Sequence, residues 1–382
     1  MPNKKTYQVG GPYFSSKDIK WIVKKTKKVL KGRLSTGPFS SEFEKKFALF
    51  IGVKYAVFLN TCTSALEIAV KSLNLKKGDE VIVPCETFIA TGMAVTSQGG
   101  KVVFANINPR TFCIDFQEIK KRTTKKTRAV MLVHFGGYMP FDSSKIKSYC
   151  KKKKIALIED CAHALGSKMG RYMAGSIGDA GCFSFFSTKT ISTGEGGMLT
   201  TNSRKLYKLA LSLRERGRDW SKKGELYTIG WRSCRVPELS AVLGLNQFSN
   251  IKKIISHRTK ICRIYNNELK KTNLFSTLLI KKQSKLSIWK HITLINHPKI
   301  KRFPLVKILR EKHKIFVNWA YDPPLHLQPV YKEKYFKNMS SYKKTENLMT
   351  RHFHLPLHMQ ISTNDAKHIV KTLIKVAKKM VL

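Results

Sequence analysis

Short apolar runs alternate with helical periodicity along the first half of the chain. The runs that predict strands are residues 55–59 (YAVFL), 80–84 (EVIVP), 101–105 (KVVFA), 129–135 (AVMLVHF), 155–160 (IALIED) and 181–186 (GCFSFF). Helical patterns lie between them at 65–73, 88–97 and 143–153. This alternation predicts an α/β domain built on a mostly parallel sheet.

Two helices are predicted before the first strand. Residues 15–31 have an amphipathic pattern that Ser15 or Ser16 is suited to cap, with apolar positions at Ile19, Ile22, Val23 and Val29. Gly37 and Pro38 break this helix, and Ser40 or Ser41 is expected to open the next one.

The pattern changes in the last third of the chain. A helix is expected from about residue 237 to 248, and after it helices mix with shorter strands up to a final helix at the C-terminus. We therefore expect a large domain over 1–250, which includes the N-terminal helix, and a smaller α/β domain over 251–382.

The composition narrows the class of protein. The 382 residues carry a formal net charge of +48, but the lysines are spread along the chain rather than collected in one arm. A solvated, lysine-rich surface is therefore favoured over a nucleic-acid-binding patch, although the charge is expected to help attract an anionic substrate.

No apolar run reaches the roughly 18 residues of a membrane span, and the N-terminus lacks the apolar stretch of a secretory signal, so we expect a cytoplasmic protein with no membrane partner. The eight cysteines form no CxxC pair, which disfavours a zinc or disulfide framework.

Lys189 is distinguished from the other lysines by its surroundings. It follows the apolar run 182–186 and precedes the turn-forming segment 193–197 (TGEGG). A lysine at the end of a buried strand and next to glycines is placed to react with a carbonyl group, as a Schiff-base lysine does. Ser184, five residues earlier, could then place its hydroxyl on a phosphate.

Three further segments each make sense around pyridoxal phosphate. Residues 60–69 (NTCTSALEIA) put Thr61, Thr63 and Ser64 at the start of a helix near Ser64, where a phosphate would be favoured, although ordinary N-capping explains this segment alone. Phe88 could stack on a flat ring, although a core position is the simpler interpretation.

The third segment is 158–166 (IEDCAHALG). Asp160 could hold a pyridine nitrogen protonated, whereas Glu159 would point to the opposite face of the strand. His163 would then lie near the other polar edge of the ring. A metal pair or a simple N-cap remains an alternative for the two carboxylates, but no third ligand stands at metal-like spacing, and we expect no metal.

Taken in order, these segments resemble the DegT/DnrJ/EryC1/StrS family of pyridoxal-phosphate-dependent sugar aminotransferases. The resemblance covers nearly all of the chain and includes LSTGP, TCTSAL, GDEVIVP, ETFIA, IEDCAHALG, FSFFSTK, LRERGRDW, RVPELSAVLGLNQ, PPLHLQPVY and LPLH. It implies fold type I, a cofactor of pyridoxal 5'-phosphate, and transfer of an amino group from an amino acid, glutamate being expected, to a nucleotide-linked keto-sugar. It also implies a homodimer.

The resemblance assigns roles residue by residue. Lys189 would form the Schiff base and move the proton between cofactor and substrate carbons. Asp160 would bind the pyridine nitrogen and His163 would lie near the ring hydroxyl. Thr63 and Ser184, with the backbone at Cys62, would hold the phosphate. The remaining assignments are Phe88 on the ring and His326 on the substrate side.

Two positions depart from the family pattern. Cys62 stands where the family often has glycine, and Ser233 stands where it often has an asparagine that reaches the cofactor phosphate of the neighbouring subunit; Arg232 or Arg235 is a candidate substitute. Family members with histidine in place of the lysine are dehydratases, so Lys189 favours transamination. A sugar dehydratase of the same family and a basic nucleic-acid-binding regulator stay as alternatives.

Overall fold

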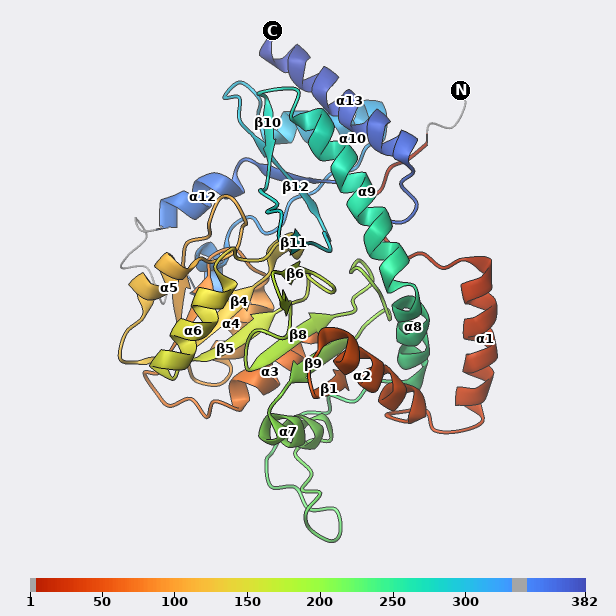
Figure 1. Ribbon diagram of the computed structural model, residues 1–382, viewed down its shortest axis with the longest axis vertical. Coiled ribbons are helices and arrows are strands. Elements are labelled where there is room, and N and C mark those ends of the chain that lie inside the picture. The colour runs from red at the N-terminus through yellow and green to blue at the C-terminus, as the bar shows by residue number, and fades with distance from the viewer. Residues whose placement is uncertain (1–4, 332–341) are drawn as a thin grey trace.

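A seven-stranded sheet forms the centre of the described part of the chain, residues 5–331 and 342–382 of a computed structural model (Figure 1). Its strands are β1 (Tyr55–Leu59), β2 (Glu80–Pro84), β3 (Lys101–Ala105), β4 (Thr127–Val133), β5 (Ala156–Asp160), β8 (Ala180–Ser184) and β9 (Gly197–Thr201). They lie in the order β1-β9-β8-β5-β4-β2-β3, and β9 alone runs against its two neighbours. The expected α/β class with a mainly parallel sheet is confirmed.

Helices cover both faces of this sheet because the strand residues that point to either face are apolar. On one face, residues such as Phe58, Val130 and Phe183 pack under α2 (Pro38–Ile51), α5 (Phe116–Arg122), α6 (Ser143–Lys153) and α8 (Glu238–Ser249). On the other face, residues such as Val57 and Met131 pack under α3 (Cys62–Lys71), α4 (Ile89–Thr96) and α7 (Arg204–Arg214). Burial on both faces explains why the strands appear as continuous apolar runs in the sequence.

Several helices begin a little earlier than predicted. Pro38 does not end a helix: it occupies the first turn of α2, with Gly37 as N-cap, because a helix start needs no N–H from that residue. Glu238 of α8 caps α2 from outside, since its carboxylate accepts hydrogen bonds from the backbone N–H groups of Gly37, Phe39 and Ser40. Likewise α3 begins at Cys62 rather than near Ser64, with Thr61 as its N-cap.

The N-terminal helix α1 (Ser16–Leu30) lies within one residue of the predicted bounds 15–31 at each end. Ser15 caps it in a reciprocal box with Asp18. Its apolar residues are less covered than an amphipathic helix implies: Val29 is buried, but Ile19 is 53% exposed and Val23 is 51% exposed. Figure 1 shows α1 standing at the edge of the molecule, beside α8.

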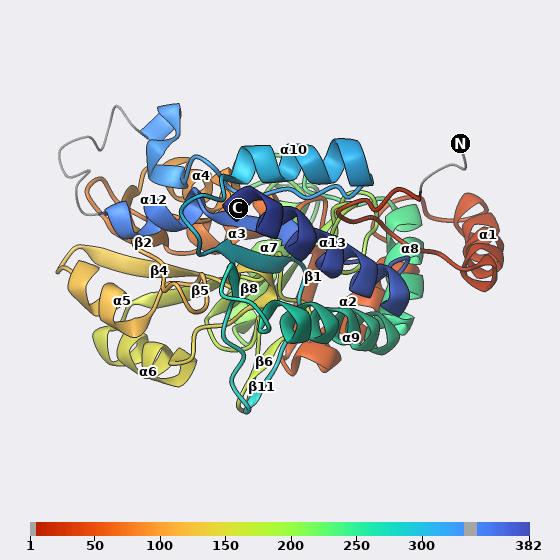
Figure 2. The same ribbon diagram turned by 90° about the horizontal axis from the view of Figure 1, so that it is seen from above.

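The C-terminal part surrounds a separate three-stranded antiparallel sheet of β10 (Phe275–Thr277), β12 (His291–Ile295) and β13 (His352–Leu355). It contains α9 (Ile251–Leu269), α10 (Arg302–His313), α12 (Lys343–Met349) and α13 (Thr363–Val381), and Figure 2 shows α9, α10 and α13 together over the central sheet. Short strands β6 (Lys168–Met169), β7 (Tyr172–Met173) and β11 (Ser284–Lys285) join the two parts. Among the described residues, no helix is both long and apolar enough to span a membrane.

Candidate active site

A cavity of about 440 Å³ lies where the carboxyl ends of the central strands meet the C-terminal part. Of the residues singled out in the sequence, it is lined by Cys62, Thr63, Phe88, Asp160, His163, Ser184 and Lys189. Strand ends at one edge of a parallel sheet are where α/β proteins bind ligands. The fold thus brings together residues that lie up to 127 positions apart in the sequence (62 to 189).

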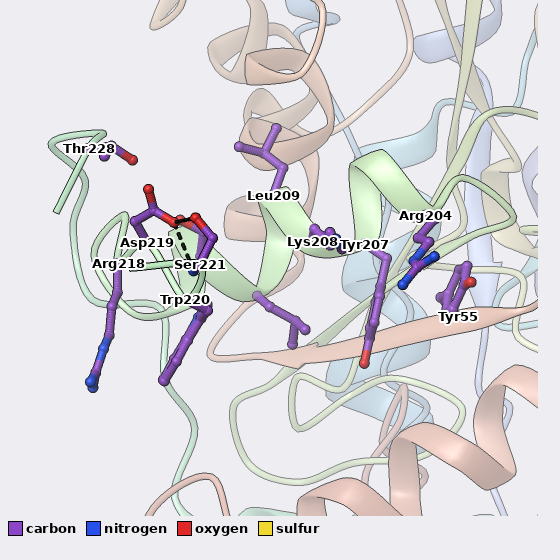
Figure 3. Close-up of a pocket in the computed structure, with 12 residues that line it drawn as sticks. Tyr55, Arg204, Tyr207, Lys208, Leu209, Arg218, Asp219, Trp220, Ser221 and Thr228 are labelled. Atoms are coloured by element: carbon purple, nitrogen blue, oxygen red, sulfur yellow. Dashed lines mark hydrogen bonds between the residues drawn. The ribbon is translucent and has the colours of Figure 1, made fainter. Parts of the chain in front are cut away.

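A larger cavity of about 960 Å³ lies elsewhere, between α7 and the loop around 218–228 (Figure 3). Tyr55, at the opposite end of β1, lines it, and its ring stacks on that of Tyr207. This larger cavity contains none of the residues selected from the sequence. Because it lacks a buried acid or amine with a shifted pKa, we place the chemistry in the smaller one.

The start of α3 forms one wall of the smaller cavity. The Thr61 hydroxyl oxygen accepts a hydrogen bond from the Ser64 N–H at 3.0 Å, so both residues serve the helix cap. The N–H groups of Cys62 and Thr63 belong to the first turn, where a helix offers no internal acceptor. Gly197 of β9 packs so closely here that an added Cβ would lie 2.4 Å from the Cys62 nitrogen. A helix N-terminus this accessible is suited to a phosphate.

Asp160 and Glu159, neighbours at the end of β5, face opposite sides of the sheet. Asp160 lines the cavity, where its carboxylate accepts hydrogen bonds from the Thr91 hydroxyl at 2.8 Å and the Ala162 N–H at 3.1 Å. Burial raises the pKa of Asp160, although these hydrogen bonds and the nearby Lys189 oppose the rise. An acid in this position is suited to bind a positively charged nitrogen.

Glu159 is part of the structure behind the cavity. Its carboxylate accepts hydrogen bonds from the backbone N–H groups of Gly175, Ile177 and Gly178 and lies 2.8 Å from Nε2 of His134. His134, Glu159 and Cys161 have possible metal-ligand atoms within 4.8 Å of one another. The fold thus brings together three such residues, although their spacing in the sequence did not indicate a metal site. Because the carboxylate already accepts these backbone hydrogen bonds, we assign this cluster to loop anchoring.

Lys189 reaches the cavity from the loop between β8 and β9. Its backbone N–H donates to the Phe186 carbonyl at 2.9 Å, and its Nζ lies 4.1 Å from the centroid of the Trp289 ring. Removal from water lowers the pKa of Lys189 to about 8, while Cys62 and Asp160 act in the opposite direction. About a tenth of this amine is therefore uncharged at pH 7, far more than for an ordinary lysine, and that form can act as a nucleophile or base.

His163 lines the cavity together with two residues from the C-terminal part, Trp289 and Tyr321. The His163 ring stacks on Trp289 at 3.9 Å between ring centroids, and its Nδ1 accepts a hydrogen bond from the Gly136 N–H at 3.3 Å. Burial, followed by the charge of Lys189, holds the pKa of His163 well below its usual value, so the ring is neutral with its proton on Nε2. That atom faces the Tyr321 hydroxyl at 3.5 Å.

Phe88 and Ser184 also face the cavity. Phe88 is the N-cap of α4 and remains 50% exposed, with its ring 5.4 Å from that of Tyr321. The Ser184 hydroxyl, at the end of β8, accepts only a 3.3 Å hydrogen bond from the Phe186 N–H among the described residues. Both groups are therefore open to a ligand.

Other candidates lie outside this cavity. His326, in the short helix Leu325–Leu327, is buried against Phe104 and Tyr342, and its Nε2 lies 3.0 Å from Glu346, so it is not among the lining residues. Arg232 and Arg235, the possible substitutes for the missing amide of Ser233, pair with Glu67 and Glu215. These contacts occupy both arginines within the chain.

The sequence did not single out three residues that line the cavity, Glu195, Trp289 and Tyr321, or Thr91, which binds one of the lining residues. Trp289 and Tyr321 lie 100 and 132 positions beyond Lys189, and no local pattern marks them. The sequence places Glu195 only within the turn-forming segment 193–197. Thr91, which binds Asp160, follows Phe88 by three positions on α4, and that helical spacing is a signal that could have found it.

An amine, a buried acid and an open helix N-terminus around one cavity define a site for a phosphorylated carbonyl cofactor. The model of the DegT/DnrJ/EryC1/StrS aminotransferase family matches residues 17–374, and the chain belongs to this family. The family depends on pyridoxal phosphate, and both its model and the relatives named below are those of aminotransferases, so this protein is an aminotransferase.

Individual relatives agree with this assignment. The chain is 32% identical to GDP-perosamine synthase of Escherichia coli O157:H7 over 89% of this chain and 90% of that protein. It is 30% identical to a UDP-4-amino-4,6-dideoxy-N-acetyl-beta-L-altrosamine transaminase of Campylobacter jejuni over 92% of this chain and 94% of that protein. Its fold matches a putative sugar aminotransferase from Streptococcus pneumoniae in its PLP form, with a TM-score of 0.88, 26% identity and coverage of 99% and 100%.

Proposed function

We propose that this aminotransferase moves an amino group from an amino acid, with glutamate as the expected donor, to the keto group of a nucleotide-linked sugar. The observation that carries the proposal is the Lys189 amine, which shares its cavity with Asp160 and the start of α3. The names of the relatives support a nucleotide-sugar substrate, although they include both GDP- and UDP-linked sugars. The net charge of +48 supports attraction of a diphosphate without selecting a base.

The residues of the cavity fit the cofactor. The close approach of Gly197 to α3 leaves the N–H groups of Cys62 and Thr63 for a phosphate, with the Ser184 hydroxyl beside them. When bound, pyridoxal phosphate supplies a carbonyl carbon that bonds to amines and a ring that withdraws electrons from that bond. We assign charge stabilisation at the ring nitrogen to Asp160 and coverage of one ring face to Phe88.

The protein residues then have distinct tasks. Neutral Lys189 Nζ can bond to carbon or take up a proton, and its lowered pKa keeps that form available. Neutral His163 can donate through Nε2 without adding a second positive charge. Trp289 donates its indole N–H to the Thr188 carbonyl at 2.7 Å and thereby holds the residue next to Lys189.

We also propose that the chain divides into a large and a small domain at about residue 250.

A direct experiment tests the assignment. Purified protein incubated with pyridoxal phosphate should absorb in the visible, and a panel of nucleotide-linked keto-sugars with glutamate should yield an amino-sugar by mass spectrometry. Lys189→Ala should abolish both signals, whereas Lys285→Ala, on a strand that does not line the cavity, should keep them. Full transaminase activity in Lys189→Ala would contradict the assignment, and loss of water without gain of nitrogen would indicate a dehydratase.

We further propose that the protein is a homodimer. The apolar residues Ile19, Val23 and Leu30 of α1 are more than half exposed, and a second copy of the chain would cover them. Phe88 and Phe186, which line the cavity, are also exposed. Sedimentation should give twice the chain mass, and the Ile19→Lys, Val23→Lys double variant should weaken the association. A wild-type monomer at micromolar concentration would refute this proposal.

A further inference from the structure

A second buried lysine, Lys290, lies behind the cavity and has no task in the chemistry described above. It is only 5% exposed, and its Nζ lies 4.7 Å from the centroid of the Trp289 ring. Lys189 Nζ lies 4.1 Å from the centroid of the same residue's ring. The two amines thus approach one indole side chain, and the distance between their nitrogens cannot greatly exceed the sum of these two distances.

Among the described residues, no acid forms an ion pair with Lys290. Within the described ranges its Nζ makes no hydrogen bond or ion pair, and an added Cβ on Gly10 would lie 3.9 Å from it. The charged or titratable groups that interact with it come from α9, from the loops after β5, β8 and β13, and from β13 itself: Arg258, His163, Lys189, His358 and His354. Those that face Lys189 are Cys62, Asp160 and His163.

Two ammonium groups this close cannot both be charged without a large repulsion. At an effective dielectric constant of about 20, the repulsion corresponds to about 1 pKa unit or more. Burial, Arg258 and the charge of Lys189 lower the pKa of Lys290 to about 7. Because coupling between two sites is reciprocal, a charge on Lys290 must lower the pKa of Lys189 by the same amount.

We propose that Lys290 is a positioning residue for Lys189: the two amines share a single positive charge beside Trp289, and Lys290 can carry it while Lys189 is uncharged to bond to carbon or take up a proton. The inference rests on the proposed role of Lys189. A neighbouring cation is a known way to activate a lysine amine. Lys290 does not line the cavity, so it acts through Lys189 rather than on the substrate.

The test measures the two lysines in full-length protein without cofactor. Acetylation of each lysine by acetic anhydride is followed as a function of pH by peptide mass spectrometry, and each titration curve gives a pKa. Lys189→Met should raise the pKa of Lys290 by about 1 unit, because a repelling charge is removed. Lys290→Arg, which makes the second charge permanent, should lower the pKa of Lys189 by a similar amount.

The controls separate charge from structure. Lys290→Met should not lower the pKa of Lys189, and Lys285→Met, which removes an exposed lysine of β11, should move neither value. An unchanged Lys290 titration in Lys189→Met would overturn the proposal, and this arm decides the matter even if Lys290→Arg fails to fold. Because no turnover is measured, a failure of the proposed sugar transamination would appear separately, as absence of an amino-sugar product in the wild type.

Discussion

Replacement of Glu159 by glutamine should damage the fold far more than replacement of its neighbour Asp160 by asparagine. The Glu159 carboxylate is fully buried and accepts three backbone hydrogen bonds of 2.7–2.9 Å, besides its contact with His134. A glutamine amide turns one acceptor oxygen into a donor that faces other donors. Since hydrogen bonds to a charged group contribute about 1.5–3 kcal/mol each, loss of two predicts a cost of about 3–6 kcal/mol.

Asp160→Asn should behave differently. Asparagine can still accept from the Ala162 N–H and share a hydrogen bond with the Thr91 hydroxyl. Burial raises the pKa of Asp160, so the ionised carboxylate opposes folding: its contribution becomes unfavourable as the pH rises through the window between the unfolded and the raised folded pKa. At neutral pH the neutral asparagine should therefore change stability by less than about 1 kcal/mol, or increase it, while weakening cofactor retention.

Urea unfolding of both variants without cofactor, followed by tryptophan fluorescence, checks this contrast. Visible absorbance after dialysis of the cofactor-loaded proteins measures retention. The reasoning would be refuted if the two substitutions cost the same free energy of unfolding, or if Glu159→Gln cost less than about 1 kcal/mol.

Three further predictions follow from the cavity. Gly197→Ala should destabilise the protein by about 1–3 kcal/mol and weaken phosphate binding, because its Cβ would collide with Thr61 and Cys62; urea titration and cofactor titration measure the two effects. Trp289→Phe should lower cofactor affinity by about 0.5–1.5 kcal/mol, since it removes the 2.7 Å hydrogen bond to the Thr188 carbonyl; fluorescence titration would show this. The rate at which Lys189 reacts with an aldehyde should fall about tenfold for each pH unit below its pKa of about 8, and a rate independent of pH there would contradict a free amine.

Local chemistry accounts for the parts of the fold that the sequence predicted well. The start of α1 follows from the Ser15–Asp18 capping box, and the central strands appear as apolar runs because both of their faces are buried. β9 was missed because Gly197 and the glycines before it resemble a turn, whereas the chain uses that glycine for close approach to α3.

The residues of the site also differ in how far the sequence could predict them. Residues at strand ends, such as Asp160 and Ser184, could be selected because parallel strands place their ends at one edge. Trp289 and Tyr321 could not, since they reach the cavity only through the packing of the C-terminal part. His326 was selected from its motif, but its pairing with Glu346 depends on α12, whose position no local pattern gives.

The reversed strand β9 explains why the lysine and the phosphate cradle are neighbours. β1 and β8 point the same way but do not touch, because β9 runs between them in the opposite direction. The connection from β8 to β9 must therefore turn back at the edge where α3 begins, and Lys189 lies within that connection. Pairing of Leu59 with Gly197 and of Ser184 with Gly197 fixes both strand ends beside one residue. Any side chain at position 197 would push α3 away from this edge, so the glycine sets the distance between the amine and the cradle.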